Sequence, residues 1–137
     1  MKNIIFLFKI IIGFVFIFTT ACSKYEEGPF ISFQSKEKRL INTWEISEIS
    51  INGENMESGC KTIYNFNEDG TGYISYLAAD SYLEWKFNEN KEQLLIRHNT
   101  EGEYQSYKII RLSKDELWLQ DVWEGNVTTM KYIPKLY

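Results

Sequence analysis

The residues with the greatest capacity for chemistry are two cysteines and a single histidine, Cys22, Cys60 and His98. A thiol can carry a lipid, form a disulfide or bind a metal, and an imidazole can bind a metal or transfer a proton. Metal sites need several such ligands at short spacings, for example two cysteines separated by two residues. The sequence has no such spacing. It therefore predicts no metal site and no cofactor.

Sequence motifs typical of catalysis are absent as well. The chain contains neither a Gly-x-Ser-x-Gly elbow nor a P-loop. The segment Glu68-Asp69-Gly70-Thr71-Gly72 lacks the alternating carboxylates of an EF-hand calcium loop, so we interpret it as a turn. Nothing in the pattern brings Glu84 and Glu103 together. Three function classes fit the sequence: a ligand-binding module, a protein-interaction module and an enzyme. We predict that the protein is not an enzyme.

The first 21 residues have the layout of a secretory signal peptide. A short basic segment precedes an apolar run from Ile4 to Phe18, and small residues follow the run. The run is short for a membrane-spanning helix, which needs about 20 apolar residues. An uncleaved anchor helix beginning near Ile4 is the alternative.

The residues after this run, Thr19-Thr20-Ala21-Cys22, resemble the lipobox of bacterial lipoproteins. The resemblance implies that Cys22 is lipidated as the first residue of the mature chain, and that residues 22–37 tether a domain to the outer membrane, on its periplasmic face or at the cell surface. Lys24-Tyr25-Glu26-Glu27 is similar to the acidic signals of surface-exposed lipoproteins, and an ordinary solvated linker is the alternative. Lipidation would leave Cys60 unpaired, whereas a disulfide between the two cysteines is the alternative in an oxidising compartment.

The charge balance argues against one class of partner. The 137 residues carry 15 Lys and Arg against 19 Asp and Glu, a formal net charge of −4. Cleavage before Cys22 removes two lysines and no acidic residue, which makes the mature chain more acidic. Because nucleic-acid-binding proteins usually present a basic stripe, we predict no nucleic-acid partner.

The rest of the chain consists of short strand patterns separated by turn residues. Ser35 is a plausible N-cap for a short helix that ends near Leu40. Pairs such as Asn52-Gly53 and Asp69-Gly70 are strong turn signals. We expect one domain over residues 38–137, with strands at residues 43–51, 62–67, 71–77, 82–87, 93–98, 104–112, 116–123 and 127–133.

Alternating apolar residues indicate that each strand has one buried face. The first strand changes phase between Ile46 and Ile49, which predicts a β-bulge near Ser47-Glu48. Eight strands with short connections form a meander, and closure of that meander would remove its two exposed edges. The predicted fold class is therefore all-β: an eight-stranded antiparallel up-and-down barrel whose last strand pairs with the first.

Three segments resemble the small bacterial lipocalin-like lipoproteins. They are the strand Leu40-Ile41-Asn42-Thr43-Trp44-Glu45-Ile46 and the turns at residues 64–71 and 112–119. The motifs are moderately specific, because they are a tryptophan and two turn patterns. True lipocalins have Gly-x-Trp on this strand, and Asn42 stands at the glycine position here. The resemblance implies an eight-stranded, calycin-type barrel and binding of a small apolar molecule.

Aromatic residues make up 16 % of the chain, and they line either a pocket or a filled core. The candidates are Trp44, Tyr64, Phe66, Trp85, Phe87, Tyr107 and Trp118. Short strands favour a mostly filled barrel with a shallow pocket at one mouth. We expect a membrane-anchored, non-enzymatic binding module for a small apolar ligand. The alternative is a protein-interaction module, such as an inhibitor or an accessory subunit of an envelope complex, with an exterior apolar patch from Tyr76, Tyr82 and Trp123.

Overall fold

The computed structural model describes residues 34–57, 59, 61–77 and 79–136. The expected signal peptide, the expected lipidation site at Cys22 and the second cysteine, Cys60, lie outside these residues. The described elements, in chain order, are α2 (Lys36–Leu40), β1 (Thr43–Ile51), β2 (Glu54–Met56), β3 (Thr62–Phe66), β4 (Thr71–Tyr76), β5 (Ala79–Phe87), β6 (Gln93–His98), β7 (Gln105–Leu112), β8 (Leu117–Trp123) and β9 (Asn126–Pro134).

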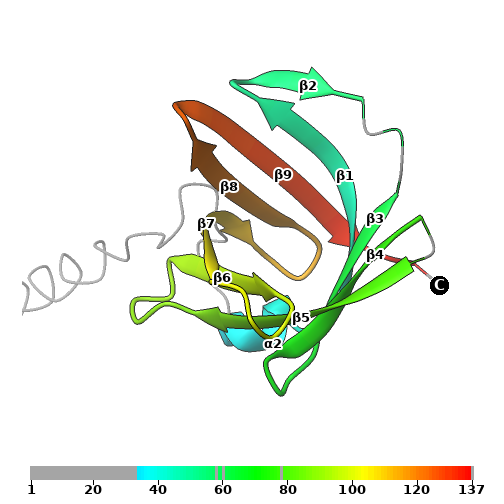
Figure 1. The fold of residues 1–137 in the computed structure, drawn as a ribbon, viewed down its shortest axis with the longest axis vertical. Helices are drawn as coiled ribbons and strands as arrows, with labels where there is room; N and C mark the ends of the chain where they lie inside the picture. Colours follow the sequence, from blue (N-terminus) through cyan, green and yellow to red (C-terminus); the bar gives the residue numbers. More distant parts are fainter. Residues whose placement is uncertain (1–33, 58, 60, 78, 137) are drawn as a thin grey trace, which may run out of the picture.

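The strands follow one another around a closed barrel (Figure 1). Neighbouring strands pair in the order β2-β1-β3-β4-β5-β6-β7-β8-β9, and β9 also pairs antiparallel with β1. The ring itself is formed by β1 and β3 to β9, so it has eight strands. The predicted eight-stranded antiparallel up-and-down barrel is confirmed, including the pairing of the last strand with the first.

β2 is an additional strand that the sequence pattern did not predict. It pairs with the second half of β1, whereas β3 pairs with the first half. Asn52 and Gly53 join β1 to β2 with φ of 52° and 84°, and two successive positive φ values are the geometry that favours Asn-Gly in a two-residue hairpin. All three residues of β2 are exposed. They therefore lack the apolar alternation that marks the other strands.

β1 contains the predicted bulge. Its pairing with β9 shifts register between Ile46 and Glu48. The Ser47 hydroxyl at the extra residue donates a hydrogen bond to the Lys131 carbonyl oxygen at 3.0 Å. The extra residue keeps Ile46 and Ile49 on the same face of the barrel although their sequence parity differs.

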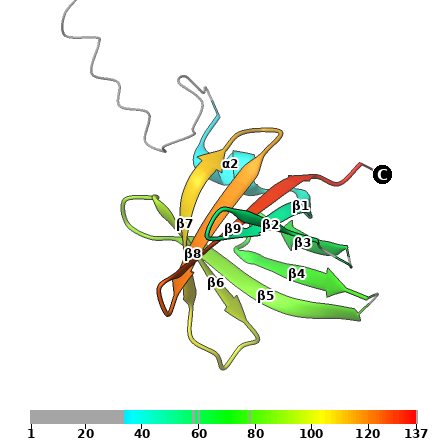
Figure 2. The same ribbon diagram turned by 90° about the horizontal axis from the view of Figure 1, so that it is seen from above.

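The strand connections divide over the two ends of the barrel. β2 and β3 both pair antiparallel with β1, and the strands from β3 to β9 alternate in direction. The β3–β4, β5–β6 and β7–β8 connections therefore share one end, whereas the β1–β2, β4–β5, β6–β7 and β8–β9 connections share the other. Figure 2 shows α2 beside the β7–β8 connection and the β8–β9 turn on the opposite side. We call the end with α2 the closed end and the opposite one the open end.

α2 covers the closed end. The Ser35 side chain caps the helix, as predicted. Leu40 and Trp44 are fully buried, and the Trp44 indole N–H donates to the Leu40 carbonyl oxygen at 2.8 Å. Arg39 donates to the Leu112 carbonyl oxygen at 2.6 Å, which ties the helix to β7. The helix and its buried leucine thus seal this end against solvent.

Candidate ligand-binding site

The closed half of the barrel interior is filled with apolar side chains. They form one continuous core and are at most 7 % exposed: Leu40, Trp44, Phe66, Leu83, Trp85, Leu94, Ile96, Ile109, Leu112, Leu117, Leu119 and Tyr132. A core packed at this burial leaves little room for a ligand. A binding site inside the barrel has to lie nearer the open end.

Aromatic rings connect the core to the open half. Edge-to-face contacts join Phe66 to Trp85 and Trp85 to Phe87, each with ring centroids 5.9 Å apart. The Tyr64 ring lies 6.1 Å from Phe66 and meets Tyr132 edge to face at 5.5 Å. Because Tyr64 is partly exposed, it marks the boundary between the filled core and the open half.

Inward-facing side chains of the open half are only partly buried. Cross-strand register places them on the same face as the core residues: Ile46, Ile49, Tyr64, Ile74, Tyr107 and Met130. Further toward the rim, Tyr76 and Trp123 also occupy inner-face positions but are 50 % and 73 % exposed. Solvent therefore reaches an inner surface that is mainly apolar and aromatic.

Three phenol groups belong to this surface. Burial raises the pKa of Tyr64 to about 12 and also raises the pKa values of Tyr107 and Tyr132. The Tyr107 hydroxyl donates to Gln105 Oε1 at 2.8 Å, and Tyr132 has a weak contact of 3.5 Å with the Met130 sulfur. The Tyr64 hydroxyl has no hydrogen-bond partner within the described residues. All three phenols are neutral at physiological pH, and Tyr64 is free to donate to a ligand.

Two further polar groups occupy inner-face positions near the open end. His98 pairs with the inward-facing Leu83, and burial lowers its pKa, so its imidazole is neutral at physiological pH. Asp121 lies across from Thr128 on the inner face and accepts a hydrogen bond from the Val122 backbone N–H at 2.8 Å. These groups make the mouth of the barrel polar while its interior stays apolar.

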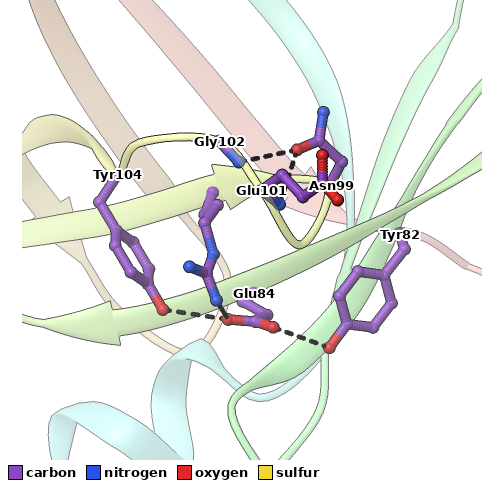
Figure 3. Close-up of polar contacts among 7 residues, drawn as sticks. Tyr82, Glu84, Asn99, Glu101, Gly102 and Tyr104 are labelled. Carbon is purple, nitrogen blue, oxygen red and sulfur yellow. Dashed lines mark hydrogen bonds and ion pairs between the residues drawn. The ribbon is translucent and has the colours of Figure 1, made fainter.

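Another polar cluster lies outside the barrel, over β5 and β6 (Figure 3). Glu84 pairs with Arg97 and accepts hydrogen bonds from Tyr104 at 3.1 Å and Tyr82 at 3.3 Å. The hydrogen bond from Arg97 is the main cause of a lowered Glu84 pKa. Beside it, Asn99 Oδ1 accepts two backbone N–H groups of the β6–β7 connection. Because the carboxylate is fully engaged, we interpret this cluster as a clamp between strands.

The structure places six of the seven candidate aromatic residues on the inner face: Trp44, Tyr64, Phe66, Trp85, Phe87 and Tyr107. Trp118 lies on the outer face, where the Arg111 and Lys131 cations stand 5.5 and 4.8 Å from its ring centroid. Its neighbours Leu117 and Leu119 take the inner positions of β8. Of the six inward rings, Tyr64 and Tyr107 reach the open half.

Asp121 was not a candidate in the sequence analysis. Its position was readable in principle, because it follows Leu117 and Leu119 at alternating spacing in one strand. A carboxylate nevertheless breaks the apolar pattern that identifies an inward face. The strand had to be placed in the barrel before this residue could be assigned to the mouth.

No protein-family model matches the sequence, and no curated protein is significantly similar to it. In the part of the chain that the structure describes, no helix is long and apolar enough to cross a membrane. Nor do the described residues bring three His, Cys, Asp or Glu side chains together in a way that could hold a metal ion.

Proposed function

We propose that the protein is a non-enzymatic binding module that takes up a small apolar ligand through the open end of its barrel. The observation that carries the proposal is the partly exposed inner surface formed by Ile49, Ile74, Met130 and the two open-half tyrosines. Small-molecule sites are typically concave and apolar, with a few polar groups that orient the ligand. Covering such a surface contributes about 25 cal/mol per Å² of apolar area removed from water.

A fluorescent naphthylamine probe tests this function. Ile49→Trp adds bulk to the open half and should weaken probe binding by about tenfold or more, a loss of about 1.4 kcal/mol. Ile133→Trp is the matched control, because Ile133 is exposed on the outer face near the closed end. The control should bind the probe like the wild-type protein, and thermal melting checks that both variants are folded.

Two results would contradict the proposal. One is a wild-type protein that binds no apolar probe and carries no small molecule in native mass spectra after purification from its own host. The other is equal loss of binding in the two tryptophan variants, because the probe would then sit outside the barrel.

We also infer that this module is a lipoprotein anchored through Cys22 to the outer membrane. The inference rests on the apolar run and the lipobox resemblance. α2, the first described element, lies at the closed end, so the chain enters the barrel from that end. Cys22→Ser should abolish fatty-acid labelling of the protein in cells. Unchanged labelling would exclude this anchor.

A protein-interaction module is the second candidate function. Its support is the group of apolar residues exposed at the open end, with Leu77 at 69 %, Val122 at 62 % and Met56 at 52 %. Exposed apolar patches often mark interfaces. The two functions differ in their response to Ile49→Trp, because a partner that docks on the rim does not need to enter the barrel.

A further inference from the structure

Carboxylates dominate the connections and strand ends of the open end. Residues 52–61, 77–80, 99–104 and 124–125 carry six acidic side chains, Glu54, Glu57, Asp80, Glu101, Glu103 and Glu124, against one lysine, Lys61. Lys61 pairs at 3.0 Å with Glu45, on the outer face of β1. The open end therefore has a negative potential that attracts cations and repels anions.

A row of directly paired residues crosses the inner face from β8 to β2, and it has a carboxylate at each end. Asp121 of β8 pairs with Thr128 of β9, Thr128 pairs with Ile51 of β1, and Ile51 pairs with Glu54 of β2. Directly paired residues point to the same face of a sheet, so Asp121 and Glu54 both lie on the inner face. Within the described part of the chain, neither carboxylate forms an ion pair.

The inner face offers these carboxylates no positive charge. The lysines and arginines of the described strands all lie on the outer face: Lys86, Arg97, Lys108, Arg111 and Lys131. The outer positions follow from register, because each of these residues alternates with buried inner-face neighbours. An anionic ligand head group beside Asp121 would therefore find no cation on the inner face to pair with.

An aromatic ring lies next to Asp121. The β7–β8 pairing Lys108↔Gln120, continued by one residue, puts Tyr107 across from Asp121. Burial and, to a lesser extent, the negative charge of Asp121 raise the pKa of Tyr107. Faces of aromatic rings attract ammonium groups. A carboxylate, an aromatic ring and an adjoining apolar wall together suit an alkylammonium group.

We propose that the ligand of the open end is a cationic amphiphile. Its ammonium group lies at the mouth beside Asp121 and Tyr107, and its apolar chain extends inward along Ile49 and Met130. Glu54, at the far end of the same row, adds to the negative potential of the mouth. This inference rests on the proposed function and specifies the chemical class of the ligand. The same site disfavours fatty acids, because their carboxylate would lie unpaired beside Asp121.

Three amphiphiles with one shared tail test the charge preference on the wild-type protein. The probes are dodecyltrimethylammonium, dodecanoate and the uncharged dodecyl maltoside, each below its micelle-forming concentration and measured by displacement of the naphthylamine probe. At low ionic strength the Kd of the cation should be about tenfold or more below that of dodecanoate. Added salt should reduce this ratio, because the mouth is exposed to solvent.

The double variant Asp121→Asn with Glu54→Gln should bring the ratio of the two Kd values to within about threefold and leave dodecyl maltoside binding unchanged. Glu89→Gln, in the β5–β6 connection at the closed end, is the control and should keep the full ratio. Equal or tighter binding of dodecanoate to the wild-type protein would overturn the charge preference while the proposed function stands. Failure of all three amphiphiles to displace a bound naphthylamine probe would overturn the proposed ligand class, whereas failure of the naphthylamine probe itself to bind would count against the proposed function as well. The wild-type series decides the question even if the double variant does not fold.

Discussion

The closed and open ends of the barrel are made by the same strands but differ in burial, polar pairing and charge. At the closed end the indole N–H groups of Trp44 and Trp85 both donate to backbone carbonyl oxygens. At the open end the Tyr64 hydroxyl has no partner among the described residues, and Trp123 is 73 % exposed. The connections at the closed end, residues 34–42, 67–70, 88–92, 113–116 and 135–136, are nearly balanced, with seven acidic and six basic residues. The negative charge is thus concentrated at the other end.

This difference indicates that one end of the barrel provides most of the stability and the other provides the surface for binding. Satisfied polar groups and dense apolar packing stabilise the closed end. The partly exposed apolar surface at the open end contributes less to folding, so it is available for binding. Binding regions are commonly drawn from the less stable parts of a protein.

The largest expected effect comes from emptying the closed end. Trp44→Ala should lower the free energy of unfolding by about 3–5 kcal/mol, because it removes a fully buried ring and leaves a cavity. The same substitution at the open end, Trp123→Ala, should change it by about 0.5 kcal/mol or less, since most of this side chain is already in water. Denaturant melting measures both values.

Similar losses of unfolding free energy in Trp44→Ala and Trp123→Ala would mean that the two ends do not differ in their contribution to stability. A loss below about 1 kcal/mol for Trp44→Ala would mean that the site collapses on itself, and the core of the closed end would then be less rigid than its burial indicates.

Most of the barrel could be predicted from the sequence because its determinants are local. Alternating apolar residues identify strands, and pairs such as Asp69-Gly70 identify turns. In the structure, Asp69 Oδ1 accepts hydrogen bonds from the Thr71 backbone N–H at 2.9 Å and the Thr71 hydroxyl at 2.6 Å. This segment is therefore a turn stabilised by its own side chains, as predicted from a sequence that lacks the alternating carboxylates of a calcium loop. β2 escaped prediction because its residues are all exposed and do not alternate.

The candidate site was less predictable because it depends on which residues share the barrel interior. Trp118 stands between two leucines, so an apolar pattern fits either face. Burial of both leucines inside the barrel places the Trp118 ring outside, beside the cations of Arg111 and Lys131. The mouth depends on pairing between β8, β9, β1 and β2, which are distant in sequence. No local pattern reveals that Asp121 and Glu54 end the same row.

A smaller effect is expected in the free energy of unfolding at alkaline pH, and it depends on Tyr64 at the boundary between the filled and open halves. Folding raises its pKa from about 10 to about 12, so the folded protein holds this proton more tightly than the unfolded chain. Stability contributed by the neutral phenol is complete below about pH 10 and is lost as the pH rises toward 12, by about 2–3 kcal/mol in all. Tyr64→Phe removes this loss, so the free energy of unfolding of the variant should fall less steeply over the same range.

Tyr64→Phe should leave stability at neutral pH almost unchanged, because the hydroxyl has no hydrogen-bond partner within the described residues and the ring is retained. Denaturant melting across the alkaline range, followed together with phenolate absorbance, compares the two proteins. Tyr107 and Tyr132 titrate in both proteins. Because the Tyr64 phenol adds to the raised pKa of Tyr132, its removal also reduces that smaller contribution, in the same direction. If wild type and variant lose stability in parallel, the Tyr64 phenol ionises as it would in water, and the boundary between the filled and open halves lies deeper than this ring. If the difference appears and a saturating cationic amphiphile enlarges it, the ligand covers Tyr64, because covering the phenol raises its pKa further.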